Sequence, residues 1–455
     1  MRQTITQLRE ALGDAQVLTG EAISQRHYSD WTRHAPTCPA ALILPRDTAE
    51  VATALRICNA ARQAVVPQGG MTGLAGGAVP RSSDIALSLD RLRGIEEIDV
   101  AAATVTVKAG TTLQEIQQAV GDAGYLFPLD LGARGSCQIG GNIATNAGGN
   151  AVIRYGMTRD LVLGLEVVLA DGRVLNLMNK MIKNNCGYDL KQCFIGSEGT
   201  LGVITRAVLK MAPQPGQTTT LLCALPDYTS AVALLRRLQR SAGTPQAYEL
   251  MWQDFFRMGV SWLEHPVAPM PDHHPLYVLL ESSAASEVLE QTLRAAIEAG
   301  EVVDAILATS QTQARSLWKI REATGEFPVR LAPLNFDISL PIGQIGDFAA
   351  LCRQRLEQRW PANHSVYFGH IGDSNLHLTV DCNSLPQPAP ILEIEELVYS
   401  AVGELGGAVS AEHGIGLLKR EFLHHSVSAE ALQTMAELKR SFDPNGILNP
   451  GKIFV

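Results

Sequence analysis

The chain has 455 residues, of which 46% are hydrophobic and 18% charged, so it is too long for one compact core and we expect two or three domains. Its net charge of −9, without a block of Lys and Arg, excludes a broad basic surface for nucleic acid. No apolar run approaches the roughly 18 residues of a membrane helix, and the first residues lack a signal-peptide pattern. We therefore expect no transmembrane segment and a cytoplasmic location, with peripheral contact at the inner membrane face left open.

The first half of the chain alternates helical and strand-like patterns. Apolar spacing predicts helices at residues 48–63 and 112–124, and strand-like runs occupy residues 64–70, 84–89, 104–110 and 199–211. The second of these helices begins at Thr111 or Thr112. Residues 160–175 form two β-branched and leucine-rich runs joined by Asp171 and Gly172, which predicts a β-hairpin.

A Pro- and Gly-containing stretch, residues 212–220, is typical of a linker. After it, strands are predicted at residues 218–225 and 277–282, and helices at residues 228–240, 286–300 and 428–442. The sequence therefore predicts an α+β protein in three parts, at residues 1–214, 215–409 and 410–455. Eight scattered cysteines without a CxxC pair indicate reduced thiols rather than a disulfide framework.

A glycine-rich loop, VVPQGGMTGLAGG, follows the strand-like run at residues 64–70. Glycine reaches positive φ at little cost, so such a loop can present successive backbone N–H groups to an anion. The glycine spacing differs from that of a Rossmann dinucleotide fingerprint. A plain structural turn is the alternative interpretation.

Two further glycine clusters follow, PLDLGARGSCQIGGNIATNAGGN at residues 128–150 and IGSEGTLGVIT at residues 195–205. Two such loops in one domain favour a large, flat ligand over a lone phosphate. One loop can take a pyrophosphate while the other lies along a ring system.

In this order the three motifs resemble the vanillyl-alcohol-oxidase-type FAD fold (PCMH type), and within it the branch of D-lactate, glycolate and D-2-hydroxyglutarate dehydrogenases. The resemblance runs from Ala35 to Val455. It implies an α+β architecture, with a two-subdomain FAD-binding domain and an α+β substrate (cap) domain that has an antiparallel sheet. The C-terminal segment would return to the FAD-binding domain.

The resemblance also implies which residues hold FAD. The pyrophosphate would be bound by Pro67, Gly69, Gly70, Met71, Thr72, Gly73 and Leu74. The rest of the cofactor would be lined by Pro128, Leu131, Gly132, Ser136, Gly140, Gly141, Asn142, Thr145, Ala147 and Gly149. Glu198, Gly199 and Ile204 would flank the adenine half, and Asn449 would close against the domain. No histidine lies between Pro67 and Pro80, so we expect non-covalent FAD.

The segment SVYFGHIGDSNLHLTV predicts a hairpin with its turn near Gly372. Seven residues apart, His370 and His377 would lie on opposite faces of a straight strand. Folded back as a hairpin, they can face each other, which makes them a plausible metal pair. Ordinary strand histidines are the alternative.

The segment SAEHGIG adds a carboxylate and an imidazole, Glu412 and His413. By resemblance to the metal-dependent members, His370, His377 and Glu412 would bind Zn²⁺ or Mn²⁺ and His413 would be the catalytic base. The substrate would be a small D-2-hydroxy acid, and its hydride would pass from C2 to flavin N5.

The resemblance implies that Arg321 binds a substrate carboxylate, with help from Thr324. Two positions depart from the 2-hydroxyglutarate enzymes: Asn335 stands where those carry lysine, and Thr379 where they carry asparagine. Both positions contact the distal carboxylate in those enzymes. The departures therefore weaken the case for 2-hydroxyglutarate and put a D-2-hydroxy acid with a neutral or differently placed tail on an equal footing, such as D-lactate or a larger aliphatic or aromatic homologue.

The sequence thus predicts an FAD- and metal-dependent D-2-hydroxy acid dehydrogenase. It leaves open a D-2-hydroxyglutarate dehydrogenase proper, an oxidase that uses oxygen, and a non-catalytic FAD-binding electron-transfer subunit. The electron acceptor would be a quinone, an electron-transfer flavoprotein or a cytochrome. A homodimer is a further expectation.

Overall fold

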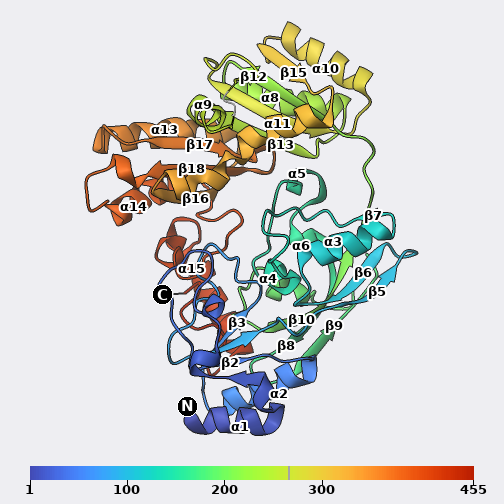
Figure 1. Ribbon diagram of the computed structural model, residues 1–455, viewed down its shortest axis with the longest axis vertical. Coiled ribbons are helices and arrows are strands. Elements are labelled where there is room, and N and C mark those ends of the chain that lie inside the picture. The colour runs from blue at the N-terminus through green and yellow to red at the C-terminus, as the bar shows by residue number, and fades with distance from the viewer. Residues whose placement is uncertain (265–266, 455) are drawn as a thin grey trace. The chain divides into compact units, whose positions relative to one another are not determined.

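The computed structural model describes residues 1–264 and 267–454, and the chain divides into two compact units (Figure 1). Unit 1 comprises residues 1–149, 155–214 and 412–455, and unit 2 comprises residues 150–154 and 215–411. The last residue of the expected C-terminal segment, Val455, lies outside the described residues. Among the helices described, none has both the length and the apolar character needed to cross a membrane.

Unit 1 contains two sheets that share one apolar core. The first has the order β1–β2–β4–β3, in which the last three strands are parallel. Its strands are β1 (Val17–Leu18), β2 (Ala41–Ile43), β3 (Val65–Gln68) and β4 (Ile85–Ser88). The second is antiparallel, with the order β5–β6–β10–β8–β9. Its strands are β5 (Ile95–Asp99), β6 (Thr104–Lys108), β8 (Val162–Val168), β9 (Val174–Leu177) and β10 (Val203–Lys210).

The helix predicted at residues 112–124 is present in unit 1. The helix α3 (Leu113–Asp122) has Thr112 as its N-cap, and Thr112 and Glu115 form a capping box. The pairing of β8 with β9 confirms the predicted hairpin at Asp171 and Gly172. The other helices are α1 (Arg2–Leu12), α2 (Thr48–Ala60), α4 (Ile139–Ala144), α6 (Thr158–Leu161), α7 (Lys191–Phe194) and α15 (Ala429–Phe442). Unit 1 also contains a short antiparallel pair of strands, β7 (Tyr125–Leu126) and β11 (Ala212–Pro213).

Unit 2 is built on one seven-stranded antiparallel sheet with the order β15–β12–β14–β13–β17–β18–β16. This confirms the expected α+β domain with an antiparallel sheet. The strands are β12 (Thr219–Leu225), β13 (Ala247–Trp252), β14 (Leu276–Ser282), β15 (Asp304–Leu307), β16 (Pro333–Ser339), β17 (Ser365–Gly369) and β18 (Asn375–Asp381).

Helices cover both faces of this sheet. The face that carries Met251, Tyr277 and Phe368 packs against α9 (Gln253–Ser261) and α11 (Gln311–Arg321). The opposite face, which carries Tyr248 and Phe336, packs against α8 (Tyr228–Ser241) and α14 (Ile391–Glu404). The remaining helices are α5 (Val152–Tyr155), α10 (Ser286–Glu298), α12 (Phe327–Arg330) and α13 (Ile345–Arg359).

The C-terminal segment, red in Figure 1, returns to the first sheet of unit 1. The N–H of Val65 donates to the carbonyl of Ile447 (2.8 Å), and the N–H of Asn449 donates to the carbonyl of Val65 (2.8 Å). The buried carboxylate of Asp443 accepts the N–H groups of Ile447 (3.0 Å) and Leu448 (2.7 Å). The carboxylate of Asp443 therefore stabilises the turn that brings residues 447–449 beside β3.

Replacing Asp443 with Ala is expected to destabilise the protein by about 2–4 kcal/mol, because two buried N–H groups and the ammonium of Lys439 lose their acceptor. Thermal unfolding should begin roughly 5–10 °C lower. The control is Glu437→Ala on the exposed face of α15, where a change within about 0.5 kcal/mol is expected. Equal shifts in the two variants would contradict this role of Asp443.

Candidate functional site

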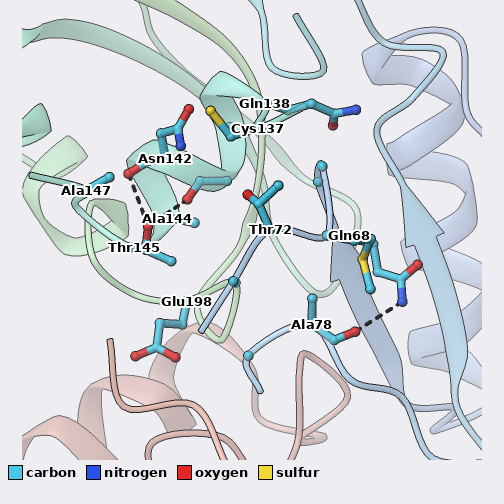
Figure 2. A pocket seen from close by; sticks show the side chains of 18 of the residues that line it. Gln68, Thr72, Ala78, Cys137, Gln138, Asn142, Ala144, Thr145, Ala147 and Glu198 are labelled. Atoms are coloured by element: carbon cyan, nitrogen blue, oxygen red, sulfur yellow. Dashed lines mark hydrogen bonds between the residues drawn. The ribbon is translucent and has the colours of Figure 1, made fainter. Parts of the chain in front are cut away.

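A cavity of about 380 Å³ lies in unit 1, where the three glycine-rich segments meet. Figure 2 shows Thr72, Gln138, Asn142, Thr145 and Glu198 around it. Most residues that the sequence assigns to FAD line this cavity: Pro67, Gly69, Gly70, Met71, Thr72, Gly73, Leu74, Leu131, Gly132, Gly140, Gly141, Asn142, Thr145, Ala147, Glu198, Gly199 and Ile204.

The first two glycine loops are in direct backbone contact. A Cβ atom at Gly70 would lie 2.0 Å from the carbonyl oxygen of Ser136, so only glycine allows this approach. Gly149 has φ of 101°, and a Cβ there would lie 2.0 Å from the carbonyl oxygen of Asp130. Glycine at position 70 therefore allows the first two loops to touch, and glycine at position 149 allows the second loop to pack against itself.

The chemistry of the cavity fits a flavin nucleotide. The buried Gln138 Oε1 and Asn142 Oδ1 accept no hydrogen bond from the residues that the structure describes, and both side chains line the cavity. They can accept from N–H or O–H groups of a ligand. Met71 and Glu198, which are not glycines, have left-handed backbones with φ of 59° and 51°. Such strain is concentrated at ligand sites.

Four of the residues assigned to FAD do not line the cavity: Pro128, Ser136, Gly149 and Asn449. Asn449 supports the cavity from behind, since its Nδ2 donates to the carbonyls of Gly77 (2.9 Å) and Glu198 (2.7 Å). The sequence missed several lining residues, among them Trp31 and Gln138. Gln138 lies inside the second glycine motif, which is the signal that could have identified it.

The carboxylate of Glu198 binds the protein backbone. It accepts the N–H groups of Ile415 (2.7 Å) and Gly416 (2.8 Å), just after His413. Burial raises the pKa of the Glu198 carboxyl, and the two N–H donors and nearby lysines oppose this effect. Glu198 therefore fixes the segment that carries the predicted base.

Glu412 and His413 both line the same cavity of unit 1. One oxygen of Glu412 accepts the N–H of Gly149 at 2.5 Å, so a hydrogen bond from the second glycine loop orients this carboxylate. The resemblance assigned both residues to the reaction centre, and the fold brings them to the wall of the flavin-type cavity.

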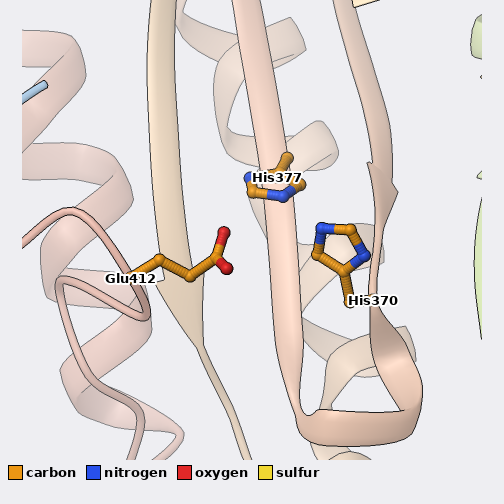
Figure 3. Close-up of side chains that lie close together, drawn as sticks. All are labelled: His370, His377 and Glu412. Atoms are coloured by element: carbon orange, nitrogen blue, oxygen red, sulfur yellow. The ribbon is translucent and has the colours of Figure 1, made fainter. Parts of the chain in front are cut away.

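The predicted histidine pair lies in unit 2, at the connection between β17 and β18. Phe368 is the direct cross-strand partner of His377, and His370 follows one residue beyond the end of β17. The two ring centroids are 5.3 Å apart, and a ligand atom of each ring lies within 4.8 Å of one on the other. Figure 3 shows the two imidazoles on these neighbouring segments. Two imidazoles so close together fit a divalent metal site.

A carboxylate lies behind each imidazole. Nδ1 of His370 is 2.6 Å from Oε1 of Glu249, and Nδ1 of His377 is 3.9 Å from Oδ1 of Asp337. Metal-binding histidines commonly donate their second N–H to a carboxylate, and the His370–Glu249 contact has hydrogen-bond length, whereas the His377–Asp337 distance is longer. Burial alone would raise the pKa of the Glu249 carboxyl, but His370 and Arg321 lower this pKa to about 2. Glu249 is therefore a carboxylate at neutral pH.

Arg321 ends α11 and is almost completely buried. Its Nε donates to Oε2 of Glu249 at 2.8 Å, and its guanidinium carbon lies 4.8 Å from the centroid of the Phe368 ring. Thr324 follows in a short 3₁₀ helix, Glu322–Glu326. Asn335 and Thr379 are cross-strand partners, and the Thr379 hydroxyl donates to Oδ1 of Asn335 at 2.8 Å.

Sequence reasoning missed Glu249 and Asp337. Glu249 lies in the buried strand AYELMW, and Asp337 lies in the buried stretch FDI of PLNFDIS. A buried charge needs a polar partner. This pattern could have identified both residues, although not their partners.

Replacing Gly70 with Ala is expected to weaken FAD binding at least roughly tenfold, about 1.4 kcal/mol, because the new Cβ would force the first two glycine loops apart. The bound flavin is measured by its absorbance after gel filtration. Gly121→Ala is the matched control, since the helical Gly121 has no atom within 4 Å of the new Cβ. Full FAD occupancy in Gly70→Ala would contradict the close contact.

Comparison with known proteins agrees with this geometry. Residues 214–453 match the family model described as FAD linked oxidases, C-terminal domain, and residues 39–178 match an FAD binding domain. The chain is 40% identical to a probable mitochondrial D-2-hydroxyglutarate dehydrogenase of Oryza sativa subsp. japonica, over 99% of this chain and 81% of the relative. It is 38% identical to a D-2-hydroxyglutarate dehydrogenase of Xanthomonas citri pv. viticola, over 99% of this chain and 96% of the relative.

The fold is also similar to that of p-cresol methylhydroxylase with substrate bound. The TM-score is 0.79 at 16% identity, over 100% of this chain and 96% of that chain. The resemblance drawn from the glycine motifs is thereby confirmed, and the chain belongs to the FAD-linked oxidases.

Proposed function

We propose that this protein is an FAD- and divalent-metal-dependent dehydrogenase that oxidises a D-2-hydroxy acid to the 2-oxo acid. The observation that carries the proposal is the imidazole pair of His370 and His377, with a carboxylate behind each Nδ1. The names of the relatives support the same class of reaction. The flavin-type cavity supplies the binding site that such a reaction requires.

Glu412 is proposed as the third metal ligand. Within unit 2, the N–H of Ala411 donates to the carbonyl of Asp337 at 3.3 Å, and Asp337 is the cross-strand partner of His377. Glu412 is the next residue along the chain, so its backbone starts beside the strand that carries His377. Two imidazoles and one carboxylate suit Zn²⁺ or Mn²⁺, and three protein ligands leave a position for substrate.

When bound, the metal would lower the pKa of the substrate hydroxyl and the flavin would accept the hydride from C2. The chain itself would then bind and orient the acid and move one proton. His413 would take the hydroxyl proton, since imidazole can change its charge near neutral pH. The terminal nitrogens of Arg321 would bind the C1 carboxylate, because Nε already faces Glu249.

The tail of the substrate is proposed to be neutral. Thr379 is buried, and its hydroxyl is paired with the amide oxygen of Asn335. On the same face of the sheet, the cross-strand neighbour of Thr379 is Val366, an apolar residue. This neutral pair offers no charge to a second carboxylate. D-2-hydroxyglutarate is the second candidate, and the names of the relatives favour it.

Anaerobic bleaching of the flavin tests the function directly. D-Lactate and larger neutral D-2-hydroxy acids are expected to bleach the metal-loaded enzyme, and their L enantiomers are not. Removal of the metal by a chelator should abolish the reaction, and added Zn²⁺ or Mn²⁺ should restore it. Bleaching that survives full chelation would remove the metal from the mechanism.

The same set of hydroxy acids tests whether the tail of the substrate is neutral or charged. Faster bleaching by D-2-hydroxyglutarate than by every neutral acid would contradict the neutral subsite. Reoxidation of the bleached flavin in air should be slow for a dehydrogenase, and fast reoxidation would indicate an oxidase instead.

Replacing His413 with Ala is expected to lower the rate of flavin reduction by roughly 10²–10⁴, because the proton acceptor is lost. FAD content should stay at the wild-type level. His424→Ala is the control, since His424 is exposed and its Nδ1 is 2.8 Å from the carbonyl oxygen of Glu421. Single-turnover stopped-flow measurements give the rate of flavin reduction in both variants. An unchanged rate in His413→Ala would show that His413 is not the base.

A further inference from the structure

Glu249 is the most deeply buried charged side chain near the histidine pair, with 1% of its surface exposed. It lies on β13, in the strand position that continues the pairing of Leu250 with Gly369 toward His370. Its neighbour on the same face, Met251, belongs to the apolar core beneath α9 and α11. An ionised carboxylate in such surroundings is costly unless both of its oxygens are bound.

Both oxygens of Glu249 have a specific partner. Oε1 is 2.6 Å from Nδ1 of His370, and Oε2 accepts from Nε of Arg321 at 2.8 Å. A carboxylate only accepts hydrogen bonds, so this contact places a proton on Nδ1 of His370, and in the neutral imidazole it leaves the lone pair on Nε2. The contact through Nε fixes one edge of the guanidinium, and the terminal nitrogens of Arg321 carry further N–H donors.

We propose that Glu249 is a positioning residue whose single carboxylate orients both the metal ligand His370 and the substrate-binding Arg321. Through Oε1 it selects the imidazole tautomer that can bind a metal through Nε2. Through Oε2 it holds the guanidinium in the orientation that receives the substrate carboxylate. This inference rests on the proposed function, and it adds a physical link between metal affinity and substrate affinity.

Glu249→Gln removes this double acceptor with little change of shape. The amide keeps one oxygen and turns an NH₂ group toward either His370 or Arg321, so one of the two contacts is lost. Zn²⁺ should bind about 10–100-fold more weakly, as for other outer-shell partners of ligating histidines. The KM for the hydroxy acid should rise more than kcat falls, because Arg321 loses its orientation.

Glu281→Gln is the matched control. Glu281 lies on the neighbouring strand β14, and its Oε1 accepts from Nε1 of Trp318 on α11 at 2.7 Å. The variant therefore removes a carboxylate that holds the same helix but does not contact His370. It should keep the wild-type affinity for Zn²⁺, and both variants should keep their FAD.

The experiment has two readouts on the full-length, flavin-loaded protein. Competition with a chromophoric chelator gives the dissociation constant of Zn²⁺ for the wild type and both variants. In the metal-free protein, ¹⁵N-histidine NMR reports the tautomer of His370, whose signal is assigned with His370→Ala. The wild type and Glu281→Gln should show the proton on Nδ1, and Glu249→Gln should lose this preference.

The outcomes separate this inference from the proposed function. Wild-type Zn²⁺ affinity and an unchanged tautomer in Glu249→Gln would overturn the positioning role and leave the proposed function standing. A wild type that binds no Zn²⁺ or Mn²⁺ would overturn the metal in the proposed function and the metal part of this inference. The tautomer measurement would then decide alone whether Glu249 sets His370.

Discussion

The two backbone hydrogen bonds that Glu198 accepts from Ile415 and Gly416 fix the segment on which the chemistry depends. They hold the chain just after His413 against the third glycine motif. The N–H of Gly149 binds the carboxylate of Glu412 at the start of the same segment. Residues 412–416 are therefore bound at both ends within unit 1. Preorganised groups of this kind lower the reorganisation that a reaction requires.

Buried carboxylates fix three parts of the fold. Glu198 fixes the segment after His413, Asp443 fixes the C-terminal turn beside β3, and Glu249 contacts His370 and Arg321. Burying a charge with its partner adds little net stability, because the loss of solvation offsets most of the attraction. Removing one partner is costly, since the other then stays buried and unpaired. These residues therefore contribute more to the geometry of the site than to the stability of the fold.

The sequence predicted the features that local pattern determines. The glycine loops, the capped helix after Thr112 and the β17–β18 hairpin all follow from spacing within short segments. It could not predict contacts between distant residues. Glu249 and His370 are 121 positions apart, and Glu198 and Ile415 are 217 apart, so no local pattern joins them. Glu198 illustrates the difference: the motif indicated that it lies at the cavity, but only the fold reveals that the backbone occupies its carboxylate.

The pair of Asn335 and Thr379 shows why similarity along the whole chain leaves the substrate open. Identity of 38–40% to D-2-hydroxyglutarate dehydrogenases covers nearly all of this chain. The choice between a charged and a neutral tail depends on very few side chains. The hydroxyl of Thr379 already has the amide oxygen of Asn335 as its acceptor, and this neutral pair would give a second carboxylate no charged partner. A neutral tail needs no such partner, so under the proposed function discrimination would change at these two positions while the reaction centre stays the same.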